Sequence, residues 1–202
     1  LGDVYKRQDY GDAAIAGMGV VTRLVSMGSL TIFGFIKGFQ PIAGYSYGAK
    51  KFNRLHEAIK TSIIWSTIFC VVYGLILALF STSIVSQFAS GNLEMIKVGA
   101  SSLRVNGISL MLFGFYTVYS SLFLALGKGK EGFILGACRQ GICFVPVILV
   151  LPMIWGLNGI LYAQPVADVL SAIITVFMAI HLHRELNEAE KQAAIAGTNE
   201  VH

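Results

Sequence analysis

An apolar segment that ends abruptly in a cluster of basic residues is the feature that most limits what this chain can fold into. Residues 38–49 are mostly apolar or small, and the basic residues that follow are Lys50, Lys51, Arg54 and Lys60. An excess of Lys and Arg beside a membrane span marks the cytoplasmic side. The segment therefore predicts a transmembrane helix that meets a cytoplasmic loop, and this loop orients the whole chain.

The composition agrees with a membrane protein. Hydrophobic residues make up 55% of the chain and charged residues 13%, with a mean hydropathy of +0.69. A soluble domain carries about a quarter charged residues. The formal net charge of +4 sits in the connections, which indicates topology and not nucleic-acid binding. Cys70, Cys138 and Cys143 lie in apolar runs without metal-ligand or disulfide spacing, so we expect no metal site.

Apolar segments separated by short polar connections predict an all-α polytopic membrane protein. The chain has about five predicted spans, at residues 13–47, 63–85, 103–126, 132–155 and 160–181. The first is longer than a ~30 Å hydrocarbon core requires, so it must tilt, bend or project into the cytoplasm.

The basic residues alternate between the connections, as a consistent topology requires. The connections predicted to lie inside hold Lys50, Lys51, Arg54, Lys60, Lys128, Lys130, Arg184 and Lys191. Those predicted to lie outside hold Lys97, with Arg104 at a helix mouth. This asymmetry places the N-terminus outside and the C-terminus in the cytoplasm.

The two ends of the sequence differ from the apolar middle. Residues 1–8 lack Met, do not continue the apolar pattern and resemble a translated sequencing adapter, so we set them aside as non-native. Residues 9–182 form the predicted transmembrane unit. Residues 183–202 are polar and rich in Ala and Glu, and we expect a frayed cytoplasmic tail.

Polar side chains inside the predicted spans are the candidate functional residues. Arg23 is deep in a span, where an ionisable group is a functional candidate by default, although a structural ion pair is an equal alternative. Gln40, Arg139, Gln140 and Gln164 either face a cavity or tie helices together. Asp168 is the single carboxylate within a predicted span outside residues 1–8, and its place near the outer end favours structural hydrogen bonding over ion coupling.

Prolines in the spans predict kinks, because each removes one backbone donor. They are Pro41, Pro146, Pro152 and Pro165. No nucleotide-binding loop, zinc spacing, nucleophile elbow or dinucleotide-binding motif occurs in the sequence. These absences disfavour an enzyme, and the polar residues within apolar helices indicate transport.

Five stretches of the sequence carry recognisable motifs: Gly38–Tyr45, Tyr47–Lys51, Gly136–Gly141, Gly156–Gly159 and Ala163–Asp168. They resemble the multidrug and toxic compound extrusion (MATE) family, most closely its bacterial MepA-like branch. The resemblance covers nearly all of residues 9–188. Ser46 departs from it, because the family usually has Asn there.

The resemblance implies a fold and a function. The chain would supply helices eight to twelve, most of the C-terminal six-helix lobe of a two-lobed fold. It would belong to a multi-pass protein of the bacterial plasma membrane, a secondary antiporter that exports cationic or amphipathic compounds in exchange for H⁺ or Na⁺ by alternating access. No cofactor and no nucleic acid is implied. The implied partners are small-molecule substrates, the lipid bilayer and the N-terminal lobe of the same protein.

The cavity-lining candidates under this interpretation are Arg23, Gln40, Tyr45, Asn106, Arg139, Gln140, Gln164 and Asp168. Two other functions stay open. A flippase for lipid-linked precursors would place basic residues in the cavity, and Arg23, Arg104 and Arg139 keep this interpretation open. A helical membrane subunit without transport of its own is the third.

Overall fold

The computed structural model describes residues 2–89, 92–155 and 157–199, and it describes side chains within these ranges except at positions 2–15, 139–140, 152, 154–161, 194 and 196–199. Over this part of the chain the regular structure is entirely helical. The elements are α1 (Gly2–Gly48), α2 (Phe52–Leu79), α3 (Ser81–Phe88), α4 (Leu93–Ala125), α5 (Gly129–Ala137), the π-helical η1 (Cys138–Ile142), α6 (Phe144–Trp155) and α7 (Leu157–Asn199).

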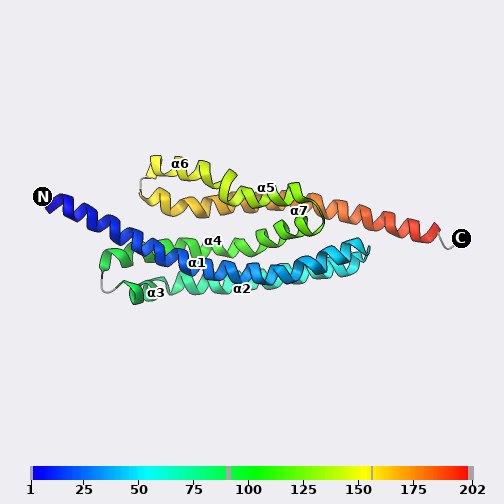
Figure 1. Cartoon of the computed structure of the whole chain (residues 1–202), viewed down its shortest axis with the longest axis horizontal. Helices are drawn as coiled ribbons and strands as arrows, with labels where there is room; N and C mark the ends of the chain where they lie inside the picture. The colour runs from blue at the N-terminus through cyan, green and yellow to red at the C-terminus, as the bar shows by residue number, and fades with distance from the viewer. Residues whose placement is uncertain (1, 90–91, 156, 200–202) are drawn as a thin grey trace.

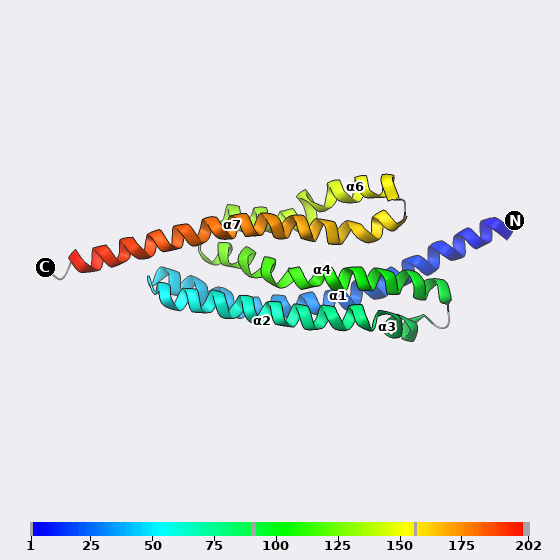
Figure 2. The ribbon, with the colours of Figure 1, turned by 180° about the vertical axis from the view of Figure 1, so that it is seen from behind.

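Helix α4 is the centre of the bundle. In Figure 1 and in the reverse view of Figure 2, it runs between α1 and α2 on one side and α7 with α5 and α6 on the other. It packs against α1, α2, α3, α5 and α7. Of its most apolar stretch, 61% is buried, against 22%, 28% and 33% in the long helices α1, α2 and α7. The other long helices therefore assemble around α4.

Glycines allow α2 and α4 to approach closely. A Cβ atom on Gly74 would lie 2.4 Å from the carbonyl oxygen of Gly107, and one on Gly107 would lie 2.8 Å from that of Gly74. Small residues at such crossings let backbones approach in a membrane, where helices associate through packing and not through the hydrophobic effect. Gly74 and Gly107 are therefore packing residues at this crossing.

Two turns carry basic residues: the turn after α1, with Lys50 and Lys51, and the turn after α4, with Lys128. These two basic turns lie at the same end of the bundle (Figure 1). After α4, the turn closes with Gly127 at φ 77°, and the Lys128 N–H donates to the Phe123 carbonyl at 2.9 Å. This is a Schellman-type helix end, in which glycine adopts the left-handed conformation without a Cβ penalty. At the opposite end, the Asn92 side chain caps α4 by accepting from the backbone N–H groups of Glu94 and Met95.

Large apolar side chains cover much of the outer surface of the bundle. Trp65 and Leu79 of α2, Phe133 of α5 and Phe177 of α7 are 63–74% exposed. A soluble protein rarely exposes so much contiguous apolar surface. Together with the helix lengths, this surface indicates that the bundle sits in lipid.

Four helices of the described chain are long and apolar enough to cross a membrane, whereas the sequence predicts about five spans. The difference is the predicted span 132–155, which is divided into α5, η1 and α6. Two features mark the break. Pro146 has no N–H to donate to the carbonyl of Ile142, the last residue of η1. Within the break, the Cys143 N–H donates to the carbonyl of Cys138, five residues earlier, at 2.8 Å, as in a π-helix. The predicted span 132–155 is therefore a broken helix.

Other boundaries also differ from the sequence-based ranges. The range 63–85 crosses the break between α2 and α3 at Phe80, and α4 begins at Leu93, well before residue 103. The segment 183–202, expected to be frayed, continues α7 as far as Asn199, because its Ala, Glu, Lys and Gln residues are strong helix formers. Helix α1 begins at Gly2 and includes most of the segment set aside as non-native, since adding residues to an existing helix costs little.

The predicted kink prolines occupy different settings. Pro41 and Pro165 lie within the continuous helices α1 and α7. Pro146 lies beside the π-helical break, and the Pro152 side chain is outside the described part of the chain.

Candidate functional site

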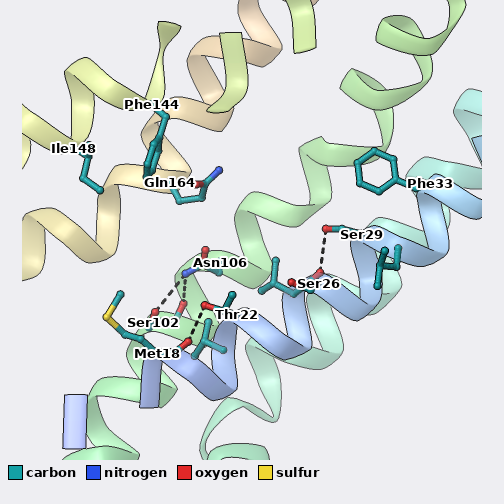
Figure 3. A pocket seen from close by; sticks show the side chains of 13 residues that line it. Met18, Thr22, Ser26, Ser29, Phe33, Ser102, Asn106, Phe144, Ile148 and Gln164 are labelled. Carbon is teal, nitrogen blue, oxygen red and sulfur yellow. Dashed lines mark hydrogen bonds between the residues drawn. The ribbon is translucent and has the colours of Figure 1, made fainter. Parts of the chain in front are cut away.

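A groove separates α1 from α6 and α7, with α4 as its floor. Figure 3 shows this groove from close by. Its volume is about 480 Å³, and it lies toward the end where α4 and α7 begin, away from the basic turns. The residues that line it are Met18, Val21, Thr22, Val25, Ser26, Ser29, Leu30 and Phe33 of α1, Ser102 and Asn106 of α4, Phe144 and Ile148 of α6, and Gln164 of α7. Ligand sites in proteins have volumes of about 300–1,000 Å³ and combine an apolar lining with a few polar groups.

Helix α1 supplies one continuous wall of the groove. Its lining residues recur every three or four positions from Met18 to Phe33, so they share one helical face. The polar members are Thr22, Ser26 and Ser29, and Phe33 closes one end with its ring (Figure 3). The Thr22 hydroxyl donates to the Met18 carbonyl at 2.9 Å, and the Ser29 hydroxyl donates to the Val25 carbonyl at 3.0 Å.

Two amide side chains face each other across the groove. Asn106 extends from α4 and Gln164 from α7 (Figure 3). The Asn106 amide nitrogen donates to the Ser102 carbonyl at 2.9 Å and to its hydroxyl at 3.4 Å. The Gln164 amide nitrogen donates to a carboxylate oxygen of Asp168 at 3.0 Å. Internal hydrogen bonds therefore hold both amides in place.

Asp168 joins α7 to α4 behind the groove. Its side chain is 7% exposed, and it accepts hydrogen bonds from the Ser109 hydroxyl and from Gln164. Asp168 is not among the groove residues, but it positions one that is. This arrangement supports the hydrogen-bonding role expected for Asp168.

The other candidates lie elsewhere. Arg23 is exposed and does not line the groove. Gln40 is half-buried and donates from its amide nitrogen to the Ser121 hydroxyl at 3.0 Å, which ties α1 to α4. Tyr45 is 63% exposed at the end of α1, where the Lys51 ammonium lies 6.0 Å from its ring centre. The side chains of Arg139 and Gln140 fall outside the described part of the chain.

The structure thus brings Asn106, Gln164 and Asp168 together and leaves Arg23, Gln40 and Tyr45 apart. Sequence reasoning missed the lining residues Thr22, Ser26, Ser29, Phe33, Ser102 and Phe144. The spacing of Thr22, Ser26 and Ser29 on one face of an apolar helix was a usable signal for the α1 wall. No comparable signal marks Phe144, because its place depends on where the broken helix restarts.

A second polar cluster lies near the opposite end of the bundle. The ring of His183 in α7 stacks on that of His56 in α2, with ring centres 6.2 Å apart. The Nε2 atom of His183 lies 3.0 Å from the hydroxyl oxygen of Tyr119 in α4. Lys128 and Glu185 form an ion pair nearby. These contacts hold α2, α4 and α7 together at the end that carries the basic turns.

Comparison with known families assigns the chain. The model of the MatE family matches residues 4–150, well over half of the sequence. This chain belongs to the MATE family of multidrug transporters. The resemblance inferred from the sequence motifs is confirmed.

Curated MATE relatives are similar over nearly the whole chain. The multidrug export protein MepA of Staphylococcus haemolyticus is 28% identical over 177 residues, which are 88% of this chain and 38% of the relative. MepA of Staphylococcus aureus is 27% identical over 188 residues, 93% of this chain and 41% of the relative. The chain therefore spans about two fifths of the length of these MATE proteins, which are transporters and not enzymes.

Solved MATE structures share the fold. The structure of the MATE multidrug transporter DinF-BH in complex with the dye rhodamine 6G is 35% identical, with a TM-score of 0.75, and the match covers 81% of this chain and 36% of that protein. An outward-facing MATE transporter of the MOP superfamily aligns with a TM-score of 0.79 at 20% identity, over 88% of this chain and 40% of the other, and shows the fold alone. The chain is thus a multi-pass, all-helical membrane protein of MATE architecture.

Proposed function

We propose that the chain is part of a secondary active efflux antiporter that exports cationic or amphipathic compounds by alternating access. Family membership, the relatives' names and the rhodamine complex of DinF-BH support transport of small organic molecules. The chain would supply most of the C-terminal lobe, and the N-terminal lobe of the same protein would complete the transport pathway.

The observation that carries the proposal is the polar groove. Polar groups at membrane depth are costly unless they face protein or a water-filled path. Here Thr22, Asn106 and Gln164 gather on one groove, whereas Trp65 and Phe177 on the outer surface suit lipid. A groove of about 480 Å³ with aromatic and polar lining suits an amphipathic ligand.

The proposed driving force is an H⁺ or Na⁺ gradient, without a bound cofactor. Among the described lining residues no carboxylate is present, and Asp168 is engaged with Ser109 and Gln164. We therefore place the coupling carboxylate outside this groove.

Dye efflux from cells tests the proposal. The complete gene is expressed in a pump-deficient bacterial strain that is loaded with the same rhodamine dye, and loss of cell fluorescence is followed. We expect faster efflux than with an empty vector, because export lowers the internal dye concentration. Collapse of efflux by a proton uncoupler indicates H⁺ coupling, and dependence on external Na⁺ indicates Na⁺ coupling. Unchanged dye retention in cells with verified protein in the membrane contradicts the proposal.

The flippase alternative is less well supported. It needs basic side chains in the cavity, but Arg23 does not line the groove, and the Arg104 Nε donates to the Ser81 hydroxyl at 3.0 Å near the bundle end. No charged side chain lines the groove among the described residues.

A further inference from the structure

The groove presents hydrogen-bond acceptors, because most of its donors are already engaged. The single hydroxyl hydrogens of Thr22 and Ser29 point back to α1 carbonyls, so only their oxygen lone pairs remain for a ligand. Both residues thus act as acceptors from the groove wall.

The two amides extend this pattern. The Ser102 carbonyl and the Asp168 carboxylate only accept, so they fix the amide nitrogens of Asn106 and Gln164 on their side. The oxygens of the two amides then have no partner among the described side chains, and Figure 3 shows the Asn106 oxygen turned away from Ser102. Against these acceptors, the described lining offers as donors the second N–H of Gln164 and the hydroxyls of Ser26 and Ser102, and Ser102 is only 2% exposed.

We propose that this groove selects ligands by their N–H groups: it binds amphipathic primary or secondary amines or ammonium ions through acceptor oxygens, and it discriminates against fully alkylated analogues of the same charge. The inference rests on the proposed function and specifies the chemistry of the same site. No charged side chain occurs among the described lining residues, so a formal charge is not the feature that the groove reads.

The energetic reason is the cost of an unmet acceptor. A ligand without N–H groups displaces water from the oxygens of Asn106 and Gln164 and leaves them unpaired, whereas one with N–H groups replaces the lost hydrogen bonds. The rings of Phe33 and Phe144 and the side chain of Leu30 provide apolar surface for the body of the ligand. A polar pattern of this kind discriminates more strongly than an apolar pocket, which tolerates a missing hydroxyl or amine.

A pair of dyes tests the inference on the unmodified protein. The first, called the secondary-amine dye below, is the rhodamine bound by DinF-BH, a cation with secondary-amine N–H groups. The second, the alkylated dye, is a xanthylium ester cation of similar size whose amine nitrogens are all alkylated. Binding to the purified protein, expressed from its complete gene and held in lipid nanodiscs, is measured by fluorescence polarisation. We expect the secondary-amine dye to bind at least about tenfold more tightly, which corresponds to more than one net hydrogen bond.

Variants locate the effect in the groove. Thr22→Val and Gln164→Met should each weaken binding of the secondary-amine dye about three- to tenfold and leave binding of the alkylated dye within about twofold. Thr31→Val is the matched control, because the Thr31 hydroxyl also donates to a carbonyl four residues earlier but does not line the groove. It should change the binding of neither dye. Valine has nearly the same shape as threonine, so the Thr22→Val variant alone can test the inference if the Gln164→Met variant fails to fold.

The outcomes separate the inference from the function on which it rests. If both dyes bind equally, or if Thr22→Val and Thr31→Val have the same effect, the inference is wrong and the transport proposal stands. If neither dye binds to folded protein and cells show no efflux, both are wrong. Preference for the secondary-amine dye that Thr22→Val and Gln164→Met reduce supports the inference.

Discussion

At the scale of single residues, the partner of a buried polar atom decides its contribution to stability. The hydroxyl of Ser46 is completely buried, and no described group accepts or donates a hydrogen bond with it. The hydroxyl of Ser109, 5% exposed, donates to the Asp168 carboxylate. Both serines lie in the bundle interior, so a substitution by alanine changes the same atom in two different settings.

Ser46→Ala and Ser109→Ala form a matched pair. Ser46→Ala should leave the free energy of unfolding within about 0.5 kcal/mol or raise it, because an unpaired polar atom is removed. Ser109→Ala should lower it by about 1.5–3 kcal/mol, because a buried carboxylate loses a donor. Thermal unfolding of the purified variants in detergent measures both. Equal losses in the two variants would mean that Ser46 has a partner, or that Ser109 contributes only its packing.

At the scale of helices, close contact along α4 decides which elements can pack. The Gly74 and Gly107 backbones meet where α2 crosses α4, and α1 and α7 also pack on α4. The tie between Gln40 and Ser121 adds a polar contact between α1 and α4, and that between Asp168 and Ser109 joins α7 to α4. The groove exists because α1 and α7 are both fixed to one central helix.

Gly74→Ala should destabilise the bundle. The added methyl group would collide with the backbone of Gly107, which moves only if the helices separate, and overpacking of this kind costs roughly 1–3 kcal/mol. We expect a lower unfolding temperature in detergent and reduced binding of the secondary-amine dye, since the floor of the groove moves with α4.

Gly34→Ala is the control for this prediction. A Cβ at Gly34 would meet nothing within 4 Å, and alanine favours the helix over glycine by about 0.5–1 kcal/mol. This variant should be as stable as the parent or more so. A loss of stability equal to that of Gly74→Ala would show that any added methyl group destabilises the bundle, and that the crossing is not special.

At the scale of the whole molecule, the charge distribution sets the direction of insertion. The turns that hold Lys50, Lys51, Lys128 and Lys130 lie at one end of the bundle, and α3 lies at the other (Figure 1). Positive residues beside spans stay on the cytoplasmic side. This charge distribution therefore predicts that the end with the basic turns faces the cytoplasm.

Cysteine labelling tests that orientation. In the complete gene without its native cysteines, Asn53→Cys and Gln87→Cys place single thiols on exposed positions at opposite ends of the bundle. In intact cells an impermeant maleimide should label Gln87→Cys and spare Asn53→Cys, and permeabilised cells should label both. Labelling of Asn53→Cys in intact cells would reverse the orientation.

The sequence by itself determined the class of the protein, the all-helical membrane fold and the family, because hydropathy, the alternation of charge and the MATE-like motifs are local properties of the chain. It also identified Asn106, Gln164 and Asp168 as candidates, since polar residues stand out in an apolar span. Only the tertiary structure decided that Gln40 ties α1 to α4, that Arg23 stays outside the groove and that the span 132–155 breaks at η1. The reason is physical: whether a polar side chain faces a cavity, a neighbouring helix or lipid depends on how each helix is rotated about its axis, and packing against α4 fixes that rotation.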